Sequence, residues 1–199
     1  MKAARWVTIG LVAALVVGAV WMPRADAARW WKLAWTLDTE VTPAKRVSVD
    51  EPGAGATLYT YVTYTITNRS LRDVDIVPLV SLVTDTHKTY YAQTVPAVKA
   101  LIERKEGAAL KSNSEMMGPI NRGGTRRGVA IFRNVDLTAK RWDIYLEGLS
   151  GEYALQLIPG RADPLILYKT YHVEIRNVGD EYEPRDSELE RVRTEWTYR

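Results

Sequence analysis

Apolar and polar residues alternate with a period of two along much of this 199-residue chain. Such alternation is typical of β-strands that bury one face and expose the other. It predicts strands over residues 30–38, 57–67, 74–84, 89–93, 127–135, 142–147, 153–158 and 165–176. Pro78 lies within the third of these segments and places that strand at a sheet edge or a bulge. Because the strands do not alternate with helices, the pattern predicts a mainly β chain built as an antiparallel β-sandwich.

One segment between the strands has helical spacing. Pro96 is a favourable first residue of a helix, and Val98, Leu101 and Ile102 fall on one face of it. Gly107 is a stop signal, because glycine readily takes the left-handed conformation that ends many helices. The sequence therefore predicts one short inserted helix, which a glycine-bearing loop follows.

The end of the chain is a charged tail with a second helical signal. Ser187-Glu188-Leu189-Glu190 has the spacing of a capping box, in which serine and glutamate side chains satisfy the first backbone N–H groups of a helix. Leu189, Val192 and Trp196 would share one face of that helix. We therefore expect residues 180–199 to form an amphipathic helical tail, which either packs on the sandwich or docks to another protein.

The chain begins with the layout of an export signal. Lys2 and Arg5 precede an uninterrupted apolar run from Trp6 to Met22. Ala25-Asp26-Ala27 then offers the small-x-small motif of a cleavage site. The run is longer than most signal cores and reaches the lower limit of a membrane-spanning helix. Both properties indicate that the rest of the chain crosses a membrane.

Two fates of this leader stay open. Cleavage would make residues 1–27 a signal peptide, whereas retention would make them an N-terminal membrane anchor. An anchored chain would associate with the membrane through Trp6 to Met22. Either fate places residues 28–179, the expected sandwich domain, outside the cytoplasm, in a bacterial periplasm or at a cell surface.

Composition excludes several kinds of chemistry. The chain has no cysteine, which excludes disulfides, thiolate metal sites, a cysteine nucleophile and a lipidated cysteine. The formal net charge is +3, and residues 1–27 hold three basic residues and one acidic residue, which leaves +1 on the remainder. Nucleic-acid binding needs a concentrated basic surface, so we expect no nucleic-acid partner.

A family resemblance extends from Thr57 to Ser150, roughly half of the chain. The segments that carry it are Tyr64-Thr65-Ile66-Thr67-Asn68-Arg69-Ser70, Ile76-Val77-Pro78, Lys88-Thr89-Tyr90, Arg122 to Phe132, and Trp142-Asp143-Ile144-Tyr145-Leu146. Their order resembles the immunoglobulin-like domains of unknown function found in bacterial lipoproteins and secreted proteins. The chain departs from them by an insertion at Val95–Gly107, by the missing lipoprotein cysteine and by the tail. The resemblance implies an immunoglobulin-like antiparallel β-sandwich and an extracytoplasmic location, and it implies no activity.

Side chains that could catalyse a reaction or bind a metal are few and scattered. His87 falls in a predicted hairpin turn and His172 on the polar face of the last strand, where a cross-strand pair is expected. Asp73, Asp75 and Asp85 are weak candidates for a metal site, because calcium needs several oxygens around one loop. No nucleophile or phosphate-binding motif occurs. The sequence therefore predicts a non-enzymatic protein without a cofactor.

Aromatic, basic and amphipathic residues near the loop and the tail are the candidates for contact with a protein partner. They are Trp30, Arg122, Arg126, Arg127, Leu189, Val192 and Trp196. The leading hypothesis is an extracytoplasmic envelope protein that binds or scaffolds a protein partner near the membrane. The alternative is a soluble periplasmic module that binds a small ligand or a carbohydrate through exposed aromatic residues such as Trp30, Tyr59 and Tyr61.

Overall fold

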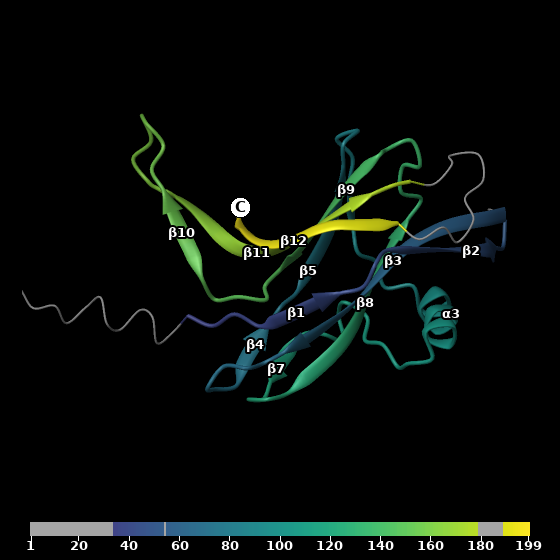
Figure 1. Cartoon of the computed structure of the whole chain (residues 1–199), viewed down its shortest axis with the longest axis horizontal. Coiled ribbons are helices and arrows are strands. Elements are labelled where there is room, and N and C mark those ends of the chain that lie inside the picture. Colours follow the sequence, from purple (N-terminus) through teal and green to yellow (C-terminus); the bar gives the residue numbers. More distant parts are fainter. Residues whose placement is uncertain (1–33, 54, 179–188) are drawn as a thin grey trace, which may run out of the picture. The chain divides into compact units, whose positions relative to one another are not determined.

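The computed structural model of the protein describes residues 34–53, 55–178 and 189–199, and these residues are mainly β (Figure 1). The strands are β1 (Asp38–Val41), β2 (Lys45–Glu51), β3 (Gly55–Thr67), β4 (Val74–Ile76), β5 (Leu79–Thr84), β6 (Thr89–Tyr91), β7 (Gly118–Ile120), β8 (Thr125–Arg133), β9 (Arg141–Glu147), β10 (Tyr153–Gln156), β11 (Leu165–Arg176) and β12 (Glu190–Tyr198). All pairs between these strands are antiparallel, as the alternation predicted. The described residues contain one α-helix, α3 (Pro96–Glu106).

The chain divides into two units, Met1–Ala34 and Trp35–Arg199, and the strands and α3 belong to the second. Several predictions lie outside the described residues. They concern the leader (residues 1–27), Trp30 and the capping-box serine, Ser187.

The first sheet is built around the long strand β3. β8 pairs with one side of β3, while β1 and β2 pair with successive parts of the other side. Val41 lies opposite Tyr64 and Lys45 opposite Tyr61, so the register shifts by one residue between β1 and β2. Pro43, which has no backbone N–H, lies at this interruption. β1 and β2 therefore form one interrupted edge strand of this sheet.

The second sheet is centred on β11. β9 and β12 pair with opposite sides of its second half, and β10 pairs with its first four residues. Beyond β9 the sheet continues through β5 to β6. Among the described strands β12 pairs with β11 alone, so β12 is an outer edge. β4 and β7 form a separate two-stranded sheet.

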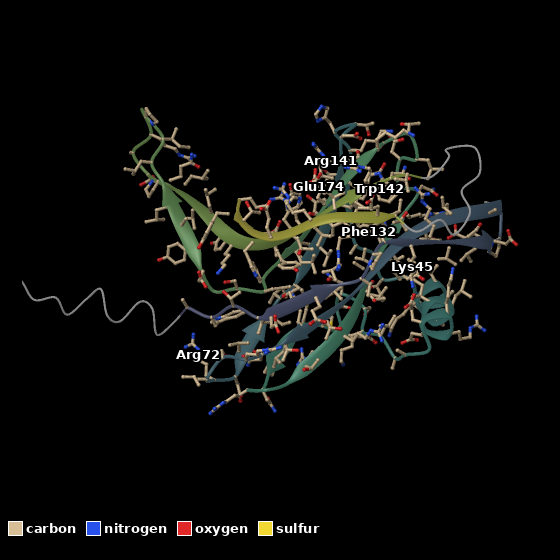
Figure 2. All side chains as sticks on the ribbon, in the orientation of Figure 1. Lys45, Arg72, Phe132, Arg141, Trp142 and Glu174 are labelled. Carbon is tan, nitrogen blue, oxygen red and sulfur yellow. The ribbon has the colours of Figure 1, made fainter. Side chains whose placement is uncertain are left out.

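The two larger sheets share one apolar core. Tyr64 and Phe132 from the first sheet belong to the same buried cluster as Trp142, Ile144 and Val173 from the second; Phe132 and Trp142 are labelled in Figure 2. None of these five side chains is more than 1% exposed. Burial of apolar surface is the dominant favourable contribution to folding, and a chain without disulfides depends on it. The arrangement is consistent with a β-sandwich.

The predicted helix is confirmed as α3. It begins at Pro96 and ends before Gly107, whose φ of 62° is the left-handed conformation that favours glycine. Val98 and Ile102 are buried and pack with residues of β3 and β8 in a second apolar cluster. α3 therefore covers part of the first sheet on the face that points away from the main core.

The strand predicted over residues 74–84 is two strands. β4 and β5 are separated by Val77 and Pro78, and they pair with different partners, β7 and β9. Pro78 cannot donate to a ladder, so the chain changes sheet at this point. The hairpin turn predicted over residues 85–88 is confirmed, since it joins β5 to β6.

The prediction of a C-terminal helix is wrong for the described part of the tail. Glu190–Tyr198 forms β12, which pairs with Lys169–Arg176 of β11. Val192 and Trp196 also fit a period of two, in a run that alternates charged residues with β-branched and aromatic ones. A short isolated helix is marginal in water, whereas the side of β11 supplies a ladder of hydrogen bonds. Tertiary pairing therefore overrides the helical spacing.

Candidate functional site

A groove of about 600 Å³ crosses the edge strand β1. β1 and the turn after it line the groove from Thr39 to Pro43. Thr65 of β3 and Arg127 of β8 line it from the first sheet, and Arg191 and Thr194 of β12 line it from the second. The groove therefore depends on the strand that replaces the predicted tail helix.

A bulge in β12 directs Arg191 into this groove. The register of β12 against β11 shifts by one residue at Val192, which has no partner on β11. Such a bulge changes which residues point to each face of a strand. Arg191 then lies opposite Ile175, a core residue, and its Nη1 donates a hydrogen bond to the carbonyl oxygen of Val41. This contact ties β12 to the edge strand of the other sheet.

The groove carries an excess of positive charge. Arg127 and Arg191 line it together with a single carboxylate, that of Glu40. Within the described structure neither arginine has a carboxylate at ion-pair distance. Burial would raise the pKa of Glu106, but hydrogen bonds from Lys45 and Tyr61 hold it below its ordinary value, and the charge of Arg127 adds a smaller contribution at longer range. The groove therefore suits a ligand that brings negative charge.

Two strand edges meet at the groove, and they are open to different extents. The free edge of β1 is short, because hydrogen bonds engage the backbone at both of its ends. Leu37 N donates to Leu149 O at 3.0 Å, and the side chain of Arg191 donates to the carbonyl oxygen of Val41. The free edge of β12 runs the length of the strand in the part of the chain that the structure describes. Open edges can pair with an extended peptide. β12 therefore offers a longer free edge than β1 for pairing with an extended peptide.

The three predicted arginines have separate surroundings. Arg127 lines the groove. Arg126 Nη1 donates to the carbonyl oxygen of Met116 at 2.7 Å, and its Nη2 donates to that of Pro119, so Arg126 fixes the loop before β8. Arg122 is exposed and does not line the groove. One of the three candidates thus belongs to the site.

The three tail residues that were expected to share a helical face do not share a surface. Leu189 is fully buried in the core, and Val192 is the exposed residue of the bulge. Trp196 is half-buried, and its ring meets Tyr171 edge-on with the ring centroids 5.1 Å apart. The described tail packs on the sandwich, which was one of the two alternatives, and it does so as a strand.

His172 forms the cross-strand contacts that were expected, but it is buried. Its Nε2 lies 2.9 Å from Asp143 Oδ1 and its Nδ1 lies 3.4 Å from Glu195 Oε1. Its ring stacks on Tyr145. Among residues 34–53, 55–178 and 189–199, no group of three or more His, Asp or Glu side chains is placed to hold a metal ion.

The three aspartates named as weak metal candidates have other surroundings. Asp73 accepts a hydrogen bond from the backbone N–H of Arg122 at 2.7 Å. Asp85 accepts one from the backbone N–H of Arg141 at 3.2 Å. Asp75 is exposed in β4. Asp73 and Asp85 therefore fix loop backbone.

The expectation of exposed aromatic residues on β3 is wrong. Tyr59 and Tyr61 are each 1% exposed and belong to the cluster under α3. Their hydroxyl groups donate to the carboxylates of Glu51 and Glu106. Their rings are therefore not available to stack on a sugar, and Trp30 lies outside the described residues.

Sequence reasoning missed an exposed apolar hairpin. β10 and the first four residues of β11 form its two strands, and we call residues 153–168 the apolar hairpin. Its exposed large apolar side chains are Tyr153, Leu155, Leu157, Ile158, Leu165, Ile166 and Tyr168. The run of apolar residues was visible in the sequence, but alternation alone does not tell whether another element covers a strand.

Comparisons of the chain with protein-family models, with curated proteins and with solved structures find no match. The described residues include no helix with the length and apolar character needed to span a bilayer.

Proposed function

We propose that this chain is a non-enzymatic, extracytoplasmic binding domain that holds an extended acidic segment of a protein partner in the groove across β1. The observation that carries the proposal is the pair Arg127 and Arg191, which share a groove beside an open strand edge without a carboxylate partner. The leader supports the location, since residues 1–27 have the layout of an export signal or anchor. Two antiparallel sheets on one core support an immunoglobulin-like sandwich.

The lining favours a peptide over a small apolar ligand. Small-molecule pockets are mostly lined by apolar and aromatic side chains. Here Thr65 and Thr194 flank the arginines and can both donate and accept hydrogen bonds, as a peptide backbone requires. β12, which supplies Arg191 and Thr194 to the lining, also has a free edge with backbone groups. An extended segment with carboxylate side chains would satisfy both kinds of group.

The arginines set the expected strength of recognition. A hydrogen bond to a charged group contributes about 1.5–3 kcal/mol when it is shielded from water, and exposed ion pairs contribute less. The side chain of Arg127 makes no hydrogen bond to another described residue, so its guanidinium is available for a carboxylate. Removal of this side chain is therefore expected to weaken binding by about tenfold.

The test is a fluorescence-polarisation titration of the protein with two labelled peptides, one alternating Glu with Val and the other alternating Lys with Val. The acidic peptide is expected to bind, and more weakly as salt rises, because charge attraction is screened. Arg127→Ala should weaken binding by about tenfold and Arg127→Glu should abolish it. Equal binding of the two peptides would contradict the proposal.

A matched control separates the groove from net charge. Arg104 is exposed on α3 and does not line the groove, so Arg104→Glu makes the same charge change elsewhere. The Kd of this variant for the acidic peptide should differ from that of the parent protein by less than about twofold. If Arg104→Glu and Arg127→Glu weaken binding equally, the groove is not the binding site.

A further inference from the structure

We propose that the apolar hairpin lies in the interface of a lipid bilayer, next to the place where the N-terminal segment joins the sandwich. This inference is independent of the peptide groove, since the hairpin shares no residue with the lining.

The hairpin concentrates the exposed apolar surface. Of the 15 large apolar side chains exposed in the described structure, seven lie on residues 153–168. Leu157 is 83% exposed. Contiguous apolar patches of this kind mark sites of protein or membrane interaction in soluble domains. The hairpin is therefore a contact surface.

The pairing register places the most exposed residues on one face. Tyr153 lies opposite Tyr168, and Leu155 lies opposite Ile166. Directly opposed residues of an antiparallel pair point to the same side, and so do every second residue along each strand. These four side chains therefore share a face, which Leu157 extends by the same alternation. Each of the five is at least 48% exposed.

The other residues of the hairpin favour an orientation along the membrane surface. Gln156 lies on the opposite face, where it pairs with Leu165. Arg161 and Asp163 lie in the exposed turn at the tip. Charged groups stay at the level of the lipid headgroups, so the tip does not enter the hydrocarbon. Tyrosines are typical of the membrane interface, because the ring is apolar and the hydroxyl is polar.

The root of the hairpin is bonded to the first residues of the sandwich. Gly151 N donates to the carbonyl oxygen of Trp35 at 2.8 Å. Glu152 accepts hydrogen bonds from Thr36 Oγ1 at 2.7 Å and from Lys169 Nζ at 2.9 Å. In Figure 1 the hairpin of β10 and β11 begins near the start of β1. Whatever precedes Trp35 is therefore joined to the chain at the root of the hairpin.

The sequence that precedes Trp35 identifies the occupant as lipid. Residues 29–32 read Arg-Trp-Trp-Lys, and tryptophans with basic residues are typical of the membrane interface. Twelve residues separate the apolar run that ends at Met22 from Trp35, which gives a reach of at most about 40 Å. The arm from the root to Ile158 is about 20 Å long. A retained leader would therefore keep the chain from Trp35 onward within reach of the bilayer, and a cleaved one would still leave the sequence Arg-Trp-Trp-Lys ahead of Trp35.

The test uses the absence of cysteine from the chain. Single cysteines replace Leu157 in one full-length variant and Leu71 in another, and both positions are 83% exposed. Each variant is labelled with the environment-sensitive dye NBD and incorporated into vesicles of phosphatidylethanolamine and phosphatidylglycerol that contain brominated lipid. Quenching of the dye by bromine reports whether the labelled position lies in the bilayer.

If the hairpin lies in the bilayer interface, the quenching of NBD fluorescence by brominated lipid should be at least about threefold stronger at position 157 than at position 71. Equal quenching at the two positions would overturn it. A blue-shifted emission at position 157 without vesicles would also overturn it. In that case another part of the chain covers the hairpin if the shift is independent of protein concentration, and a second copy covers it if the shift grows with concentration.

Failure of this proposal can be told apart from failure of the groove proposal. Arg127→Glu in the Leu157→Cys protein should leave the quenching unchanged, because the groove and the hairpin share no residue. A loss of quenching in that variant would show that the two surfaces are coupled and would overturn the claim of independence.

Discussion

The two halves of β11 differ in burial and in strand pairing. Its second half, Tyr171–Arg176, pairs with β9 on one side and β12 on the other, and Val173 and Ile175 are fully buried. Its first half, Leu165–Tyr168, pairs with β10 as a two-stranded hairpin, and Ile166 is 48% exposed. The exposed half is the more apolar of the two, since Leu165–Tyr168 is apolar at every position whereas Tyr171–Arg176 alternates apolar with polar residues. The comparison shows that apolar content alone does not make a strand part of the core, because the covering elements decide which half is buried and which is exposed.

The cover over the second half comes from distant parts of the chain. β12 and the opposing sheet supply it, and Leu189 and Trp196 of the tail contact the core. Apolar residues stabilise a fold only to the extent that they leave water. The first half of β11 has no such cover in the described structure. Its apolar residues therefore contribute little to stability and remain available for binding.

The largest expected effect comes from matched isoleucine truncations in the two halves. Ile175→Ala should lower the free energy of unfolding by about 2–5 kcal/mol, because it opens a cavity in a fully buried site. Ile166→Ala should lower it by less than about 0.5–1 kcal/mol, because water already reaches that side chain. Urea denaturation of the two variants checks this difference. Equal losses would show that the first half is covered in solution.

A smaller effect is expected from the strand that covers the second half. Trp196 packs on Tyr171, and Lys169 Nζ lies 5.5 Å from the centre of its ring. Trp196→Ala should therefore cost about 1–3 kcal/mol, less than a fully buried tryptophan would. Thermal unfolding measures the loss. A variant as stable as the parent would contradict the view that β12 stabilises the sandwich.

The smallest expected effect is a pH dependence at the root of the hairpin. Burial alone would raise the pKa of Glu152, but hydrogen bonds from Thr36 and Lys169 outweigh it and hold the pKa below its ordinary value of 4.5. A lowered pKa gives stability that is present above about pH 4.5 and is lost as the pH falls further. Glu152→Gln should therefore lower the Tm by about 1–3 °C at neutral pH.

The pH dependence of the Glu152→Gln variant tests whether the charged carboxylate stabilises the protein. As the pH falls below about 4.5 and through the lowered pKa of Glu152, the carboxyl group of the parent protein becomes protonated, so the Tm values of the parent and of Glu152→Gln should converge. Calorimetric scans at several pH values follow the difference. If the difference in Tm between the two proteins grows as the pH falls, the charged form of Glu152 does not stabilise the root of the hairpin.

Local signals predicted the elements that depend on local chemistry. Pro96 and Gly107 bound α3 as expected, since a fixed φ starts a helix and a left-handed glycine ends it. Most of the predicted strands are present, because alternation separates the two faces of a strand, whether or not another element covers one of them. Pro78 was recognised as an edge or bulge residue, but the change of sheet that it permits depends on β7 and β9, which are distant in the sequence.

Features that depend on tertiary pairing could not be predicted. The tail residues Val192 and Trp196 fit both helical and strand spacing, and only the side of β11 favours the strand. Arg127 was named as a contact residue from its charge, but the groove that it lines also needs Arg191, which a one-residue bulge orients. Tyr59 and Tyr61 were expected on an exposed face because α3, which covers them, lies far along the chain.

The most direct test of the difference between the two halves of β11 is hydrogen–deuterium exchange of the full-length protein with and without phosphatidylethanolamine–phosphatidylglycerol vesicles. Residues 171–176 should be protected in both conditions, because β9 and β12 bond both sides of that half. Residues 153–168 should exchange readily alone and become protected with vesicles. Vesicles that leave exchange in residues 153–168 unchanged would contradict the assignment of the first half as a membrane-contact surface.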